Sequence, residues 1–313
     1  SSSANNDDTY VLDRWYILSD GNDIIDVSQE TSTIPTNGKY AIALDVETAN
    51  KKFGIAQIIE GKNCVGLIGD TITFSFKAKV SDTSKLDNVK AAIVSWSGTE
   101  DTVTSDIISA WGNEGTNPTL ITNATYENTP ANLSLTTSYA TYSVSANIDT
   151  SGAKNIIVFI WSDVTDTTAG HFLYVTDCQL ERGNVATPFE HRSYTDDVKS
   201  CQRYFFQSSR WGQAFSSDSD AHFIHYSGVS VGGSAWMWAN AFFPVTMRVN
   251  PTLTTSDYAG NTGKISIWTS TGGSTTNNIS PYTTGSNINS YFVSDYANTK
   301  YGIKGAIRAD AEL

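Results

Sequence analysis

The segment from Thr71 to Ala78 alternates strictly between polar and apolar side chains, and this pattern restricts the fold more than any other in the chain. Ile72, Phe74, Phe76 and Ala78 would lie on one face of a strand, with Thr71, Thr73, Ser75 and Lys77 on the other. A strand with one apolar face needs a second layer to cover it. The pattern therefore predicts a sheet that packs on a hydrophobic core through one face.

Other segments have the same strand-like character, and turn-forming residues separate them. They are Tyr10–Tyr16, Tyr40–Val46, Phe53–Ile59, Ala91–Trp96, Tyr139–Ile148, Ile156–Trp161 and His171–Leu180. The 313 residues include 15 Tyr, 13 Phe and 8 Trp, whereas charged residues make up only 17%. Aromatic and β-branched residues favour strands. About eight strands in this order predict an all-β fold and, for the first part of the chain, a jelly-roll β-sandwich.

One helix is predicted, from Tyr194 to Phe206. Tyr194, Val198, Cys201 and Phe205 recur at helical spacing, Thr195 can cap the N-terminus, and Asp196 and Asp197 suit its positive end. Lys264–Trp268 and the last seven residues then return to strand character, with a long polar loop expected over Ser270–Asn289. The predicted organisation is a linker (1–9), a jelly-roll domain (10–192), a short helical connector (193–206) and a C-terminal β-sandwich tip (207–313).

Charge and composition exclude several classes of function. A net charge of −12 argues against nucleic acid and anionic membranes as partners. The sequence has no apolar run long enough to cross a bilayer, so no membrane insertion is expected. Its polar first residues lack the apolar core of a signal peptide, and we expect the native chain to extend further in the N-terminal direction. Cys64, Cys178 and Cys201 lack disulfide or zinc spacing and are expected to be free thiols.

Motifs of known catalytic sites are missing from the sequence. It has no Gly-x-Ser-x-Gly elbow, no His-Glu-x-x-His and no phosphate-binding glycine loop. His222 and His225 would point to opposite faces of a strand. No catalytic residue is therefore assigned, and the chain is expected not to be an enzyme. Paired carboxylates of a glycosidase stay open, because their pairing is spatial and cannot be read from sequence.

A resemblance to a known class lies at the predicted domain boundary. Gln179-Leu180-Glu181, Gly183, Ala186-Thr187-Pro188-Phe189-Glu190 and Arg192, followed by Cys201-Gln202-Arg203-Tyr204, resemble a signature of phage tail-fibre and related phage structural proteins. The resemblance implies a carbohydrate-binding-module-like jelly roll followed by a receptor-binding tip. It further implies a virion component, made in the host cytoplasm, that attaches to a host surface glycan or receptor as a homotrimer. Other tail proteins would bind through a region N-terminal to this sequence.

Aromatic side chains are the candidate sugar contacts, because a Trp or Tyr face stacks on a pyranose ring. In the first domain the candidates are Trp96 and Trp111, and Trp111 is expected to be exposed because it lies in a Gly/Asn-rich loop. In the tip they are Trp236 and Trp238, which share one face of a strand, together with Trp211 and Tyr226. Core packing is the alternative for each of them, and it is expected for Trp161.

The family likeness also implies a metal site. Carbohydrate-binding jelly rolls often hold a structural Ca²⁺ beside an aspartate near their final strand, and Asp177 occupies a comparable place. The alternative is a hydrogen-bonded or solvent-facing aspartate; no cofactor is required.

Three other functions remain open besides non-catalytic host attachment. They are a glycan depolymerase or esterase with sites between subunits, a secreted carbohydrate-binding module, and a first domain that is only a spacer.

Overall fold

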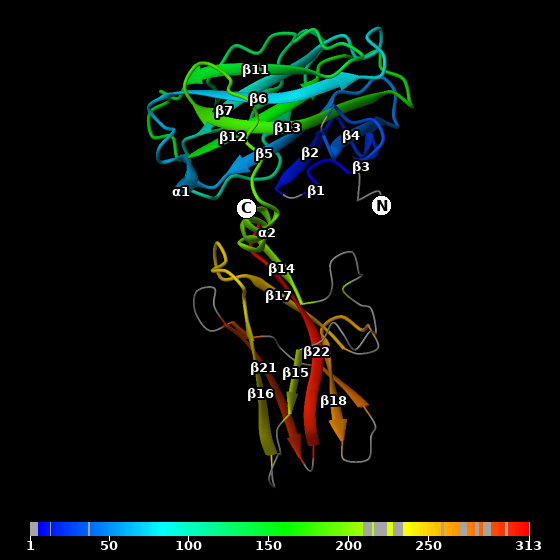
Figure 1. Cartoon of the computed structure of the whole chain (residues 1–313), viewed down its shortest axis with the longest axis vertical. Helices are drawn as coiled ribbons and strands as arrows, with labels where there is room; N and C mark the ends of the chain where they lie inside the picture. The colour runs from blue at the N-terminus through cyan, green and yellow to red at the C-terminus, as the bar shows by residue number, and fades with distance from the viewer. Residues whose placement is uncertain are drawn as a thin grey trace. The chain divides into compact units, whose positions relative to one another are not determined.

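A computed structural model describes residues 6–12, 14–36, 38–208, 215, 224–227, 234–257, 260–269, 274–278, 282–283, 289–297 and 300–312. Within several strands of the last hundred residues it describes the backbone and not the side chains. The chain divides into two compact units, which meet in sequence between His191 and Arg192 (Figure 1). Almost every regular element in the described residues is an antiparallel strand, so the all-β prediction is confirmed.

The first unit is a sandwich of two antiparallel sheets (Figure 1). The six-stranded sheet has the order β1 (Tyr10–Leu12), β2 (Trp15–Ser19), β5 (Phe53–Ile59), β12 (Asn155–Ser162), β7 (Val89–Trp96) and β10 (Ala124–Tyr126). The five-stranded sheet has the order β11 (Ala140–Asn147), β6 (Thr71–Val80), β13 (Phe172–Arg182), β4 (Ala41–Val46) and β3 (Ile25–Glu30). A helical turn, α1 (Gly61–Cys64), and a small hairpin of β8 (Ile108–Ala110) and β9 (Thr119–Leu120) complete it.

The hydrophobic core lies between the two sheets. Strand β6 contributes Ile72, Phe74, Phe76 and Ala78, each no more than 1% exposed, which confirms the alternation expected for this segment. Side chains from β5 and β12 of the other sheet, such as Ile55 and Ile160, pack in the same cluster. Burying a side chain of this size contributes about 1.5–3 kcal/mol, so this layer holds the sandwich together.

A second apolar cluster covers the outer face of the six-stranded sheet. Strands β7 and β12 are buried along their whole length, because the segment from residue 103 to 121 lies over the face that points away from the core. Ile107 and Trp111 from this segment pack against Phe159 and Trp161 of β12. The continuous apolar run in β12 is thus the signature of a strand buried on both faces.

The second unit is also built from antiparallel strands. They are β14 (Phe205–Gln207), β15 (Ile224–Ser227), β16 (Ser234–Phe242), β17 (Thr252–Ser256), β18 (Lys264–Thr269), β19 (Ser274–Asn278), β20 (Tyr282–Thr283), β21 (Asn289–Ala297) and β22 (Lys300–Asp310). Strand β22 pairs with β14, β15, β17 and β18, and β21 pairs with β16 and β20. The loop expected over Ser270–Asn289 is therefore wrong in part, since β19 and β20 lie within it. No helix in the described part of the chain is long and apolar enough to cross a membrane.

Helix α2 spans Tyr194–Gln202 and is shorter than predicted. Its N-cap is Ser193, whose Oγ accepts a hydrogen bond from the Asp196 amide, so the assignment of the cap to Thr195 is wrong. The helix ends before Phe205, because that residue begins β14 and pairs with Asp310 of β22. Pairing with a long strand outweighs the helical spacing of Phe205.

Candidate functional site: a groove on the open sheet face

The outer face of the five-stranded sheet carries a groove of about 520 Å³. Three parts of the chain form it: the turn after β3, the outward positions of β6, and the residues just before β11. Its lining consists of Thr33, Ile34, Pro35, Thr36, Lys77, Lys79, Thr137, Ser138 and Tyr139. Most of these side chains carry a hydroxyl or an ammonium group, so the groove presents donors and acceptors to a polar ligand.

Lys79 is held in this groove by two aromatic rings. Its Nζ lies 5.6 Å from the ring centroid of Tyr139 and 5.2 Å from that of Tyr174, distances typical of cation–π contacts. The Tyr139 hydroxyl donates a hydrogen bond of 2.8 Å to the Thr33 carbonyl, which ties the two rims together. Burial raises the pKa of Tyr139 to about 12, so this hydroxyl keeps its proton at neutral pH. Tyr174 in turn stacks on Phe172, with ring centroids 5.6 Å apart.

The second lysine of the groove, Lys77, pairs with Asp177. Its Nζ lies 2.8 Å from Asp177 Oδ2. Asp177 sits at a bulge of β13 with φ +50°, where the register to β6 shifts between Thr176 and Gln179. A bulge re-aims a side chain, and aspartate tolerates this left-handed conformation better than most residues. The ammonium of Lys77 therefore lies beside Asp177, the residue for which a structural calcium ion is predicted.

A metal ligand set is not found around Asp177. No group of three His, Cys, Asp or Glu residues that could hold a metal lies within the residues that the structure describes. The residue lines a smaller, mainly apolar pocket of about 260 Å³. Its other lining residues are Leu12, Trp15, Gln29, Tyr40, Ala41, Ile42, Val175, Thr176 and Cys178. The salt bridge between Asp177 and Lys77 thus joins a residue of this pocket to a residue of the groove. A calcium ion at Asp177 stays a prediction.

The tryptophans predicted to bind sugar in the first domain are buried. Trp111 is 9% exposed and Trp96 is 8% exposed, so the expectation that Trp111 is exposed is wrong. Both belong to the second apolar cluster, where Trp111 packs 6.1 Å from Phe159 and the Trp96 Nε1 donates to the Thr99 carbonyl. Their rings are not available as stacking surfaces in this structure. Trp161, expected in the core, is fully buried.

The other four candidate sugar contacts belong to the second unit. Trp236 and Trp238 lie on β16, opposite Asp295 and Val293 of β21, and Tyr226 lies on β15. Their side chains fall outside the described residues, as does the whole of Trp211. Sugar contacts at these four positions stay predictions.

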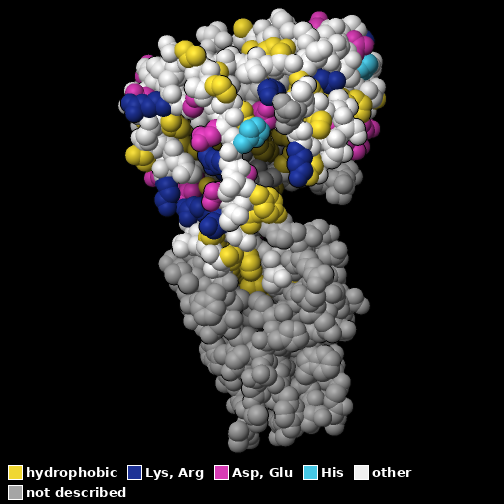
Figure 2. Space-filling model, in the orientation of Figure 1, with side chains coloured by type: hydrophobic (Ala, Val, Ile, Leu, Met, Phe, Trp, Pro, Cys, Tyr) yellow, Lys and Arg dark blue, Asp and Glu magenta, His cyan; other side chains and the backbone are white. Residues whose placement is uncertain are grey.

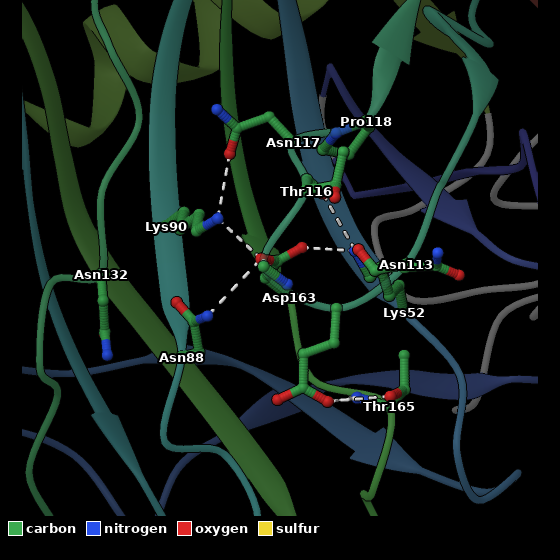
Figure 3. Close-up of polar contacts among 12 residues, drawn as sticks. Lys52, Asn88, Lys90, Asn113, Thr116, Asn117, Pro118, Asn132, Asp163 and Thr165 are labelled. Atoms are coloured by element: carbon green, nitrogen blue, oxygen red, sulfur yellow. Dashed lines mark hydrogen bonds and ion pairs between the residues drawn. The ribbon is translucent and has the colours of Figure 1, made fainter.

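A buried polar cluster pins the long covering segment to the first unit (Figure 3). Asp163, at the end of β12, binds Lys52 Nζ through Oδ1 at 2.5 Å and Lys90 Nζ through Oδ2 at 2.6 Å. Lys52 also donates to the carbonyls of Asn113 at 2.7 Å and Thr116 at 3.1 Å. The side chains of Lys52, Lys90 and Asp163 are almost fully buried, so the cluster holds the segment in place and offers its charges to no ligand.

The residues of the tail-fibre-like signature bind one another. We call Gln179, Glu181, Thr187 and Glu190 the clasp. Thr187 donates from its amide to Glu181 Oε1 at 2.8 Å and from its hydroxyl to Oε2 at 2.7 Å. Gln179 Oε1 accepts a hydrogen bond of 2.8 Å from the backbone amide of Glu190. The clasp therefore folds the chain after β13 back onto the end of that strand, and hydrogen bonds from Thr187 hold the pKa of Glu181 below its usual value.

The visible surface of the first unit has a mixed composition. Figure 2 shows basic, acidic and hydrophobic side chains interspersed over the visible face of the first unit. The sequence predicted that Lys77 points away from the core. It did not predict that Lys79, Tyr139 and Tyr174 meet. Lys79 lies on β6, Tyr174 on β13 and Tyr139 just before β11, and these three strands are neighbours only in the sheet.

Comparison with known proteins identifies no family. No family model matches the chain, and no curated protein matches its sequence. Solved structures resemble part of it. The enzymatically active domain of bacteriophage CBA120 tailspike protein 4 is 13% identical with a TM-score of 0.35, over 58% of this chain and 21% of the tailspike chain. This chain thus spans only about a fifth of that protein.

Binding modules from other proteins give similar values. TmCBM61 in complex with β-1,4-galactotriose is 15% identical with a TM-score of 0.29, over 54% of this chain and 88% of the module. The CBM22-1 xylan-binding domain of Paenibacillus barcinonensis Xyn10C is 10% identical with a TM-score of 0.34, over 59% of this chain and 100% of that domain. Similarities at this level assign neither a family nor a ligand to this chain.

Proposed function

We propose that the first unit is a non-catalytic carbohydrate-binding domain and that the groove over Lys77, Lys79 and Tyr139 is its binding site. The observation that carries this proposal is the difference between the two outer sheet faces. The covering segment buries the outer face of the six-stranded sheet, whereas the five-stranded sheet presents an open groove lined by hydroxyl and ammonium groups. A saccharide presents hydroxyl groups that can pair with such donors and acceptors.

The wider role we propose is attachment of a phage virion to a host surface glycan or protein. It rests on the resemblance of the signature around the clasp to phage tail-fibre proteins. In this role the chain would act as a homotrimer, joined to other tail proteins through a region N-terminal to this sequence. Linked sites can raise avidity by a factor on the order of 10²–10⁴, which would offset weak binding at each groove.

Filling the groove tests the binding site. Ser138 is exposed in the groove lining, and a Ser138→Trp substitution would fill the space that a sugar ring needs. Ser151 is exposed in a turn outside this lining, so Ser151→Trp is the matched control. On a glycan microarray we expect the unmodified chain and Ser151→Trp to bind the same glycans and Ser138→Trp to lose them. Equal binding by both variants would show that sugar binds elsewhere.

Two further measurements test the rest of the proposal. Incubation with a bound glycan should release no new reducing ends; reproducible turnover would replace the binding role with that of a depolymerase. Light scattering should give the mass of a trimer, and a stable monomer would contradict the tail-fibre role.

A further inference from the structure

The groove contains two charged side chains, and both are cationic. Lys77 and Lys79 belong to its lining, whereas Asp177 and Glu30, the acidic residues that interact with them, do not. Lys77 is neutralised by Asp177 at 2.8 Å. Lys79 forms no ion pair within 4.0 Å and donates no hydrogen bond among the described residues; its contacts are the rings of Tyr139 and Tyr174. The groove therefore holds one ammonium whose hydrogen-bond donors are unused.

Glu30 does not supply the missing partner. Its carboxylate accepts hydrogen bonds from the backbone amides of Ser32 and Thr33, which hold the pKa of Glu30 below its usual value. Lys79 makes only a minor, longer-range electrostatic contribution to that lowering. The carboxylate of Glu30 is thus used within its own turn, and it shapes the groove rim rather than neutralising Lys79.

The two rings fix the position of the Lys79 ammonium but accept no conventional hydrogen bonds from its N–H groups. Aromatic faces attract a cation through their quadrupole, but they offer no strong acceptor for its N–H groups. Because the side chain is already held in place, less conformational entropy is lost when a ligand binds. An ammonium prepared in this way suits an anionic oxygen better than a neutral hydroxyl, because charge-assisted hydrogen bonds are about twice as strong.

We propose that the groove binds sugars that carry an anionic substituent, and that Lys79 contacts this substituent directly. The inference rests on the proposed carbohydrate-binding function and deepens it by naming the ligand class. The anion is a carboxylate, phosphate or sulfate on a saccharide, and the hydroxyls of Thr137 and Ser138 contact the neighbouring sugar oxygens. The net charge of −12 repels anionic glycans from most of the chain, so a preference for them would indicate a specific local contact and not general attraction.

A glycan microarray with matched pairs tests the ligand class. Each pair shares a backbone and differs only in the anionic group, with uronates against their methyl esters, phosphorylated against unphosphorylated sugars, and sulfated against unsulfated sugars. Four forms of the full chain are compared: unmodified, Lys79→Met, Lys79→Arg and Lys62→Met. Lys62 is exposed on α1 and lies outside the groove lining, so its variant controls for the loss of one positive charge.

We expect the unmodified chain to bind the anionic member of a pair and Lys79→Met to weaken that binding on the order of 10- to 100-fold, the range for a hydrogen bond to a charged group. Lys79→Arg and Lys62→Met should keep it. The three kinds of pair show which anion is recognised. Equal binding of both members, unaffected by Lys79→Met, would overturn the inference and leave the proposed function standing. No binding to any glycan would overturn both.

Discussion

The buried cluster around Asp163 allows a quantitative prediction for Asp163→Asn. Asp163 pairs with both Lys52 and Lys90, whose side chains are 1% and 7% exposed while its own is fully buried. An amide has nearly the same shape as the carboxylate but carries no charge. The variant therefore leaves two buried ammonium groups without a counter-ion, while the packing around them hardly changes.

The expected cost follows from the burial of these groups. Removing one partner of a buried ion pair costs about 3–5 kcal/mol. This is a large share of the roughly 5–15 kcal/mol that stabilises a typical domain. For a unit of this size each kcal/mol lowers the melting temperature by about 2–4 °C, so the first unit should melt about 6–20 °C earlier.

The structure also supplies a control and a local readout. Asp166 pairs with Lys85 at 3.7 Å and its side chain is 62% exposed, so Asp166→Asn should cost less than about 1 kcal/mol. The covering segment contains Glu114, whose carboxylate binds Thr165, and a protease specific for glutamate should cut there faster in Asp163→Asn. Calorimetry and proteolysis together check the prediction. A melting temperature and cleavage rate equal to those of Asp166→Asn would refute the view that Asp163 holds this segment.

Three further predictions concern the clasp and a buried thiol. Thr187→Val removes the hydroxyl that binds Glu181, so amide exchange at Thr187 and Glu190 should quicken, while Val185→Ala, at a 70% exposed side chain, should leave it unchanged. The lowered pKa of Glu181 means that the clasp is intact above the ordinary value of 4.5 and weakens as the pH falls through the lower folded value. Amide exchange at Thr187 should show this acid dependence, and Glu181→Gln should abolish it. Burial raises the pKa of Cys64 to about 12, so thiol reagents at pH 8 should label it only after unfolding; rapid labelling of the native chain would contradict its burial.

Local sequence pattern predicted the strands well where larger apolar side chains recur at every second position. The alternation in Thr71–Ala78 and Tyr40–Val46 reappears as inward side chains of β6 and β4, because a period of two assigns each residue to a face. It was less informative where both faces are buried. The continuous run in β12 indicated an inner strand but not that a loop rich in glycine and asparagine would cover its outer face.

The misplaced site follows from the same limitation. Trp111 was expected to be exposed because its neighbours are polar. Those neighbours instead fix the segment to the sheet, because the Asn113 and Thr116 carbonyls accept hydrogen bonds from Lys52. Lys52 and Asp163 are 111 residues apart in sequence, so no local pattern could pair them. The groove has the same origin, since Lys79, Tyr139 and Tyr174 become neighbours only through the order β11, β6, β13.

The residues of the signature serve the local structure of the chain after β13 and not the groove. The polar groups of Gln179, Glu181 and Thr187 form hydrogen bonds with one another. Gly183, with φ +117°, makes the turn that brings them together. The Gly183 amide and carbonyl bind Thr71 and Thr73 of β6, which fixes the turn to the five-stranded sheet. Residues used in this way set where the chain leaves the sandwich. The groove lining contains none of them, so the signature residues and the proposed binding site are separate parts of the first unit.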